Sequence, residues 1–174
     1  MKPILIGLCG LKGSGKTTLA QELVKIHNYH RLSFAQPLRD GLRAMGVPDT
    51  FLYDHKQTPI PDMGGKDARW LLQTLGTEWG RVLITPDIWV NCLRNRYRRL
   101  NENGQRCVID DVRFDNEAKF ITEAGGVIVE VMRGGTQGDG HVSEQGVSPD
   151  LVDFKIRNDD SVTDGLRNLE SVIL

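Results

Sequence analysis

The stretch from Gly10 to Thr17 reads Gly-Leu-Lys-Gly-Ser-Gly-Lys-Thr, which fits the pattern GxxxxGK followed by Ser or Thr at every fixed position. Glycines in such a loop let successive backbone N–H groups face a polyphosphate, and the following helix adds partial positive charge. Lys16 can bridge the β- and γ-phosphates, the Thr17 hydroxyl can ligate Mg²⁺, and Thr18 supplies the next amide donor. A glycine-rich turn with a solvated lysine is disfavoured, because the loop lies between a predicted strand and a predicted helix. The pattern predicts a nucleoside triphosphate site.

Arginines outside this loop bear on the reaction, because GTPases, ATPases, helicases and kinases all share the loop itself. An enzyme that phosphorylates a phosphate group must neutralise a second anion and exclude water. The arginines at or near the ends of predicted elements are Arg39, Arg69, Arg81 and Arg113. Arg133 opens a glycine-rich segment, 133–140, that has the composition of a mobile lid. Any one of these taken alone can be an ordinary surface residue, and Arg94 to Arg99 are expected on a solvated helix face.

Two acids, Asp110 and Asp111, end a predicted strand. An acid at this place can reach Mg²⁺ or its water shell beside the phosphate loop. Because side chains alternate along a strand, only one of the two is expected to face the site, and the periodicity does not choose between them.

Strands alternate with helices along the chain, which predicts a three-layer α/β/α P-loop NTPase domain with a mostly parallel five-stranded sheet. The expected strands are 4–9, 30–35, 107–109, 127–132 and 151–156. The expected helices are 16–28, 37–45, 67–75, 79–83, 86–100, 114–124 and 161–174, with Ile26, Met45 and Val162 among their inward residues. We expect one domain, 1–174, with a substrate-side loop or insertion at 47–66 and a lid at 133–148.

Composition limits the partners. The chain has 174 residues and a formal net charge of −1, so no overall basic field favours nucleic acid or an anionic membrane. No apolar run approaches the about 20 residues of a membrane helix, and the start of the chain does not resemble a secretory signal, which favours a cytoplasmic location. Cys9, Cys92 and Cys107 lie in apolar stretches and are expected to be reduced core residues, not zinc ligands.

Several segments together resemble the bacteriophage deoxynucleoside monophosphate kinases, a family within the P-loop nucleoside monophosphate kinase group. Beyond the phosphate loop, the resemblance rests on Phe34-Ala35-Gln36-Pro37-Leu38, Arg69-Trp70-Leu71-Leu72-Gln73-Thr74-Leu75-Gly76-Thr77, Trp89-Val90, Asp111-Val112-Arg113 with Glu117, His141-Val142-Ser143-Glu144 and Ile156-Arg157-Asn158-Asp159. It covers nearly the whole chain.

The resemblance implies that the chain transfers the γ-phosphoryl group of ATP, with Mg²⁺, to a deoxynucleoside 5′-monophosphate. The implied ATP-binding residues are Lys12, Gly13, Gly15, Lys16, Thr17 and Thr18. The implied acceptor-binding residues are Arg69, Gly76, Trp89, Asp111, Arg113 and Glu117. We predict that Lys16, Arg113, Arg133 and Asp111 act in catalysis, and that Mg²⁺ takes Thr17 directly and Asp111 through water.

Structural roles compete with these assignments. Trp89 also fits the apolar stripe of its helix, Glu117 can be a solvated helix carboxylate, and Asp111 can cap the following helix. His141 is expected to make a hydrogen bond within the lid.

Two other functions remain open at this stage. A dephospho-coenzyme A kinase or another small-molecule P-loop kinase would share the loop, the arginines and the sheet. A nucleotide-dependent switch would also bind a triphosphate, but the chain lacks an NKxD-type guanine signature. The accepted bases and ribose selectivity are left open, a homodimer is compatible with the sequence, and a phage origin would place the enzyme in the host cytoplasm.

Overall fold

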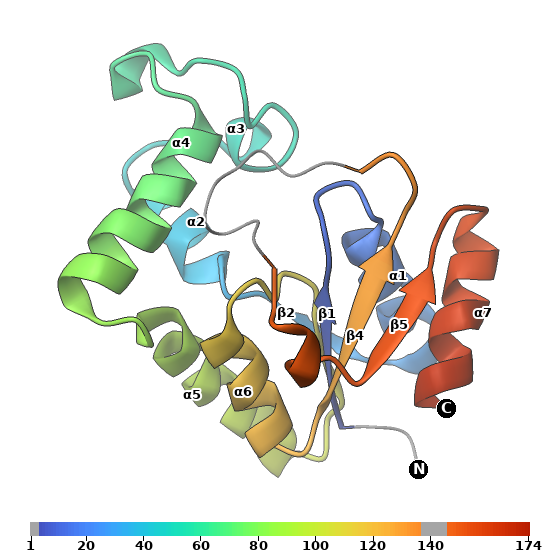
Figure 1. Cartoon of the computed structure of the whole chain (residues 1–174). Helices are drawn as coiled ribbons and strands as arrows, with labels where there is room; N and C mark the ends of the chain where they lie inside the picture. Colours follow the sequence, from blue (N-terminus) through green and yellow to red (C-terminus); the bar gives the residue numbers. More distant parts are fainter. Residues whose placement is uncertain (1–3, 137–145) are drawn as a thin grey trace. The chain divides into compact units, whose positions relative to one another are not determined.

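The computed structural model describes residues 4–136 and 146–174. The chain forms two compact units, Met1–Ser33 with Leu93–Leu174 and Phe34–Cys92. The first unit contains a five-stranded sheet (Figure 1). Its strands are β1 (Leu5–Cys9), β2 (His30–Leu32), β3 (Cys107–Ile109), β4 (Val127–Met132) and β5 (Phe154–Arg157).

The strand order is β2-β3-β1-β4-β5, and every neighbouring pair is parallel. Strand β1 lies in the middle, where Ile6 is paired with Val108 on one side and Val127 on the other. All five residues of β1 are buried, as expected for a continuous apolar run covered on both faces. The predicted five-stranded sheet is confirmed, although β2 ends earlier and β5 begins later than the sequence indicates.

One face of the sheet packs against α1 (Lys16–His27) and α7 (Val162–Ile173), which lie side by side in Figure 1. The core of this layer combines Ile6 and Leu8 of β1 with Leu19 and Leu23 of α1 and with Leu169 of α7, among others. The inward direction was wrong for two side chains, since Ile26 and Val162 are 53% and 46% exposed. Each lies beside the buried stripe of its helix, where an apolar side chain need not be covered.

The other face of the sheet packs against α6 (Asp115–Glu123). A Cβ at Gly7 would lie 2.7 Å from Ile121 Cδ1, so glycine is needed for this close approach of strand and helix. Tyr97 of α5 (Ile88–Glu102) meets Phe120 edge to face, with ring centroids 6.0 Å apart. Helices therefore cover both faces of the sheet, which confirms the three-layer arrangement.

Helix α5 presents Arg94, Arg96, Arg98 and Arg99 to solvent, as expected, and Leu93 and Tyr97 to the core. Among the residues that the structure describes, no helix is both long enough and apolar enough to span a membrane.

Two of the three cysteines are buried, as predicted. Burial raises the pKa of Cys9 to about 12, with a further contribution from Glu130, and that of Cys107 to about 11. Both thiols therefore stay protonated at neutral pH. Cys92 is exposed, which corrects its assignment to the core.

The second unit has a core of its own, made of Leu42, Val47, Leu52, Ile60 and Ala68. Its elements are α2 (Gln36–Ala44), α3 (Asp49–Tyr53), the 3₁₀ turn Pro61–Met63, α4 (Ala68–Gln73), the π-helix Thr74–Ile84 and the start of α5. Segment 47–66 is thus no simple loop, because it contains α3 and supplies three of these core side chains. Helices this short show no clear period in the sequence. Met45, expected inward, is 61% exposed just after α2.

Asp67 is the N-cap of α4, and its carboxylate accepts a hydrogen bond of 2.7 Å from the Trp70 amide. The expected break at Gly76 is wrong, since the chain continues from α4 directly into the π-helix. Gly76 and Gly80 are buried there, and a Cβ at Gly80 would lie 2.5 Å from the Trp89 ring. Packing of Trp89 against the bare backbone offsets the low helix propensity of glycine.

Candidate active site

The phosphate loop joins β1 to α1 at the carboxyl end of β1 (Figure 1). Gly10, Gly13 and Gly15 have φ values of +125°, +83° and +94°, a region that other residues rarely adopt. A Cβ at Gly10 would overlap the Val131 carbonyl oxygen, so the loop begins in close contact with the end of β4. Gly15 is the N-cap of α1. The backbone therefore wraps ahead of the helix N-terminus in the way that phosphate binding requires.

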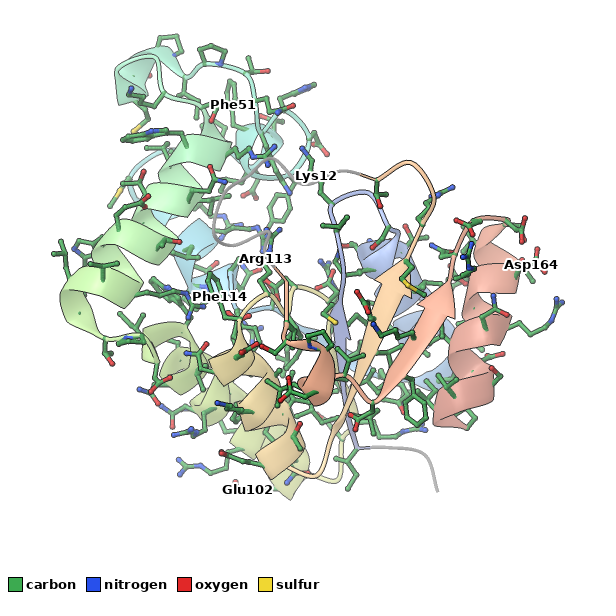
Figure 2. All side chains as sticks on the ribbon, viewed as in Figure 1. Lys12, Phe51, Glu102, Arg113, Phe114 and Asp164 are labelled. Atoms are coloured by element: carbon green, nitrogen blue, oxygen red, sulfur yellow. The ribbon has the colours of Figure 1, made fainter. Side chains whose placement is uncertain are left out.

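Lys16 directs its ammonium group back into this loop. Its Nζ donates to the carbonyl oxygens of Gly10 and Leu11, each at 2.7 Å, and to the hydroxyl of Ser14 at 3.2 Å. Lys12 is exposed on the same loop (Figure 2). A phosphate oxygen is an ionised acceptor and binds an ammonium more strongly than a carbonyl does, so a bound phosphate can draw Lys16 from these partners.

Asp110 contacts the start of α1. Its Oδ2 accepts hydrogen bonds from the Thr17 hydroxyl at 2.6 Å and from the Arg31 guanidinium at 2.8 Å. The residue is 3% exposed, and its Oδ1 is buried with no hydrogen-bond partner among the described residues. A buried carboxylate oxygen without a partner is costly, so an additional donor or cation is expected there.

Asp111 faces different partners, as strand alternation predicts. Its Oδ2 accepts a 2.6 Å hydrogen bond from the hydroxyl of Ser33, the residue that follows β2. It does not cap α6, whose N-cap is Phe114. The contact between Thr17 and Asp110 therefore indicates which of the two acids lies at the phosphate loop.

The Thr17–Asp110 pair fits the Mg²⁺ that accompanies a bound nucleoside triphosphate. The described residues contain no cluster of three or more His, Cys, Asp or Glu side chains suited to hold a metal. A nucleotide-bound Mg²⁺ does not need one, because it keeps several waters and takes one or two protein oxygens plus phosphate oxygens. A threonine hydroxyl beside an acid with one open oxygen supplies such a set.

Glu117 holds the backbone that carries Arg113. The carboxylate is 2% exposed, and its Oε2 accepts hydrogen bonds from the amides of Arg113 at 2.7 Å and Phe114 at 3.2 Å. The alternative of a solvated helix carboxylate is therefore wrong. Arg113 itself is exposed and lies just before α6, next to Phe114 (Figure 2).

An open cavity of about 550 Å³ adjoins Arg113. Its lining comes from the start of α6 and from residues 146–149. The Asp115 carboxylate closes one edge by accepting hydrogen bonds from the Ser148 amide at 2.8 Å and hydroxyl at 2.6 Å. These two bonds lower the pKa of Asp115 below its ordinary value.

The predicted lid is described only at its two ends. Residues 137–145, which include His141, lie outside the described part of the chain. Arg133 is exposed, and its carbonyl accepts a hydrogen bond from the Thr136 hydroxyl at 2.8 Å. The next amide, that of Gly134, donates to the Asp159 carboxylate at 2.6 Å.

The remaining predicted residues, Arg69, Gly76 and Trp89, belong to the second unit. Trp89 is 6% exposed, and its indole N–H donates to the Gly76 carbonyl at 2.7 Å. These contacts bring Gly76 and Trp89 together and favour core packing for the tryptophan. Arg69 is half-buried, and its amide donates to the Lys56 carbonyl at 2.9 Å. An acceptor-binding role for these residues stays a prediction.

Sequence reasoning gave no role to Arg31, Ser33 and Asn158, although all three contact predicted site elements. Asn158 follows β5 and donates from Nδ2 to the Ser14 carbonyl at 2.7 Å. Their positions in the sequence could have indicated a role. Each of the three residues lies in, or just after, a strand of the parallel sheet, and ligand sites are common at the carboxyl ends of such strands.

Comparison with known proteins agrees with this geometry. The sequence model of the family described as deoxynucleotide monophosphate kinase matches residues 65–169. A protein of Acanthamoeba polyphaga mimivirus, provisionally named a deoxynucleotide monophosphate kinase, is 37% identical over 155 residues, which cover 81% of this chain and 80% of that protein.

Two solved structures share the fold. A provisionally assigned kinase of Chloroflexus aurantiacus aligns over 100% of both chains with a TM-score of 0.55 and 12% identity. The dephospho-CoA kinase of Campylobacter jejuni aligns over 98% of this chain and 95% of its own, with a TM-score of 0.50 and 15% identity. At these identities the likeness concerns the fold alone, and it confirms the predicted α/β fold of P-loop kinases.

Proposed function

Since the chain belongs to the deoxynucleotide monophosphate kinase family and is thereby a phosphotransferase, we propose that it converts a deoxynucleoside 5′-monophosphate and ATP to the diphosphate and ADP. One observation supports a triphosphate as the phosphoryl donor. The Lys16 ammonium lies inside the glycine-rich loop, where it donates to the Gly10 carbonyl, and the neighbouring Thr17 hydroxyl donates to the buried Asp110 carboxylate. This is the set of groups that a phosphoryl donor with Mg²⁺ requires.

ATP is proposed to bind through Lys12, Gly13, Gly15, Lys16, Thr17 and Thr18. The loop amides and Lys16 would hold the phosphates, and Thr17 would ligate Mg²⁺, which neutralises phosphate charge when bound. Asp111 was the predicted water-mediated partner of the metal. The direct contact between Asp110 and Thr17 supports Asp110 for that role instead, while Asp111 keeps its hydrogen bond with Ser33.

The acceptor phosphate is proposed to bind Arg113, since a guanidinium can grip two phosphate oxygens at once. Glu117 would serve the same site indirectly, because its buried carboxylate holds the Arg113 amide. The cavity beside Arg113 is of a size typical of small-molecule sites. Arg69, Gly76, Trp89 and Asp111 complete the proposed acceptor-binding set on the strength of the family resemblance.

Catalysis in this scheme relies on positioning and charge neutralisation. A phosphate monoester is already ionised near neutral pH, so its oxygen can attack without a general base. Lys16, Arg113 and Arg133 would neutralise negative charge on the donor phosphates, on the acceptor phosphate and on the γ-phosphoryl group in transfer. ATP and deoxynucleotides are metabolites of the cytoplasm, where we place the enzyme.

An ADP-release assay tests the proposal across the four common deoxynucleoside monophosphates, the ribonucleoside monophosphates and dephospho-coenzyme A. We expect turnover with at least one deoxynucleoside monophosphate. Activity confined to dephospho-coenzyme A, or ATP hydrolysis that no acceptor stimulates, would refute it. Arg113→Ala should raise the KM for the acceptor by about tenfold or more, as expected for a lost charge-assisted hydrogen bond. Arg96→Ala, a change at an exposed arginine of α5, is the matched control.

A further inference from the structure

Buried polar side chains gather around the candidate site. In the described part of the chain they are Ser14, Asp110, Glu117 and Asn158. Ser14 belongs to the phosphate loop, Asp110 contacts Thr17, and Glu117 holds the Arg113 backbone. Asn158 is the member of this set that neither the predicted nor the proposed mechanism uses.

We propose that Asn158 is a positioning residue that orients the phosphate loop for the triphosphate, an inference that rests on the proposed use of ATP. Its Nδ2 donates a 2.7 Å hydrogen bond to the carbonyl oxygen of Ser14, and this bond is buried. The asparagine is itself held from its backbone, because its amide donates to the Met132 carbonyl at 2.9 Å. A fixed donor therefore reaches the loop from the end of β5.

The geometry of the peptide bond turns this contact into an orientation of the loop. The carbonyl of Ser14 and the amide of Gly15 belong to one planar trans peptide, so they point in opposite directions. Asn158 lies beneath the loop and is only 6% exposed. Holding the Ser14 carbonyl inward therefore directs the Gly15 amide outward, where a phosphate oxygen can accept its hydrogen bond.

Two glycines make room for the asparagine. A Cβ at Gly15 would overlap Asn158 Nδ2, and a Cβ at Gly165 would overlap Asn158 Oδ1. Gly15 needs its positive φ in any case, but Gly165 lies within α7 and has no such backbone requirement. A glycine inside a helix costs about 1 kcal/mol relative to alanine. The space that Asn158 occupies explains why α7 carries one there.

Direct binding measurements separate this role from general stability. The probes are the non-hydrolysable ATP analogue AMPPNP with Mg²⁺, and each common deoxynucleoside monophosphate, titrated by calorimetry. Asn158→Ala removes the donor, and Asn158→Leu removes the donor while keeping a similar shape and adding no charge. Asn103→Ala is the matched control, because Asn103, just after α5, also donates from Nδ2 to a backbone carbonyl, that of Arg99 at 2.7 Å.

We expect both Asn158 variants to bind AMPPNP about tenfold or more weakly, the usual effect of a lost buried hydrogen bond. Monophosphate affinity should change by less than twofold in both, and Asn103→Ala should match the wild type.

Each of the other outcomes refutes either the proposed use of ATP or the positioning role of Asn158. A wild-type protein that binds no AMPPNP would refute the proposed use of ATP, and the role of Asn158 with it. Wild-type binding that both Asn158 variants retain would refute the positioning role alone. Equal losses for both ligands, or a loss confined to one of the two variants, would also refute it. If Asn158→Ala does not fold, Asn158→Leu decides the question.

Discussion

Replacing Glu117 with alanine should weaken the Arg113 segment in a measurable way. The carboxylate is 2% exposed and accepts hydrogen bonds from two amides, at 2.7 Å and 3.2 Å. A hydrogen bond to a charged group contributes about 1.5–3 kcal/mol. Because the two amides are only partly buried, water can replace part of this, and we expect a loss of about 2–4 kcal/mol in the free energy of unfolding. For a chain of this size the thermal midpoint would fall by roughly 4–16 °C.

The same change should act on the acceptor and not on ATP. Released from Glu117, the Arg113 backbone no longer presents its guanidinium in one place, so the KM for the monophosphate should rise by about tenfold while the KM for ATP changes little. Glu117→Gln keeps an uncharged oxygen that can accept both hydrogen bonds, which meet at Oε2 in the wild type, and it should show about half the loss of stability because neutral bonds are about half as strong. Glu123→Ala, at an exposed position of the same helix, is the control. A normal acceptor KM in a folded Glu117→Ala protein would show that Glu117 does not position Arg113.

Three further predictions concern the phosphate loop and the edge of the cavity. Asp110→Asn should raise the Mg²⁺ concentration for half-maximal activity by about 10- to 100-fold, as for other groups that act through a metal-bound water; an unchanged Mg²⁺ titration would contradict this. Lys16→Ala should lower kcat by roughly a hundredfold or more; a kcat close to the wild-type value in a folded Lys16→Ala protein would contradict this. The bonds from Ser148 lower the pKa of Asp115 in the folded state, so their stabilisation is complete above the unfolded-state pKa and is lost as the pH falls through the folded-state pKa. When the pH is lowered below about 4, the free energy of unfolding should therefore fall by less in Ser148→Ala than in the wild type.

The features that the sequence predicted well depend on local patterns. The run Ile4 to Cys9 and the glycine pattern of the phosphate loop each lie within a few consecutive residues. Their place in a parallel sheet covered on both faces followed from the alternation of strands and helices, whereas the central position of β1 comes from the structure. The resemblance to deoxynucleoside monophosphate kinases added the family, which the comparisons confirm.

The features that were wrong or missed depend on contacts between distant residues. Segment 47–66 carries core residues whose partners lie in α2 and α4, so no local period reveals its burial. The π-helix forms despite the low helix propensity of its two glycines because Trp89 packs against Gly80. Glu117 looks like a surface carboxylate in a helix pattern, and only the fold shows that it accepts from the Arg113 amide.

The sheet order explains why the missed groups meet the predicted ones. All strands are parallel, so every carboxyl end lies at one edge, and β1 with its phosphate loop has β3 and β4 as neighbours. Strand β3 therefore brings Asp110 to Thr17, and the end of β4 meets Gly10. Strand β5 lies one place further out, and Asn158 spans that distance to Ser14. A substitution just after any of these strands should thus disturb phosphate binding more than a substitution at the amino end of the same strand does, because buried residues at the amino ends contribute to packing only.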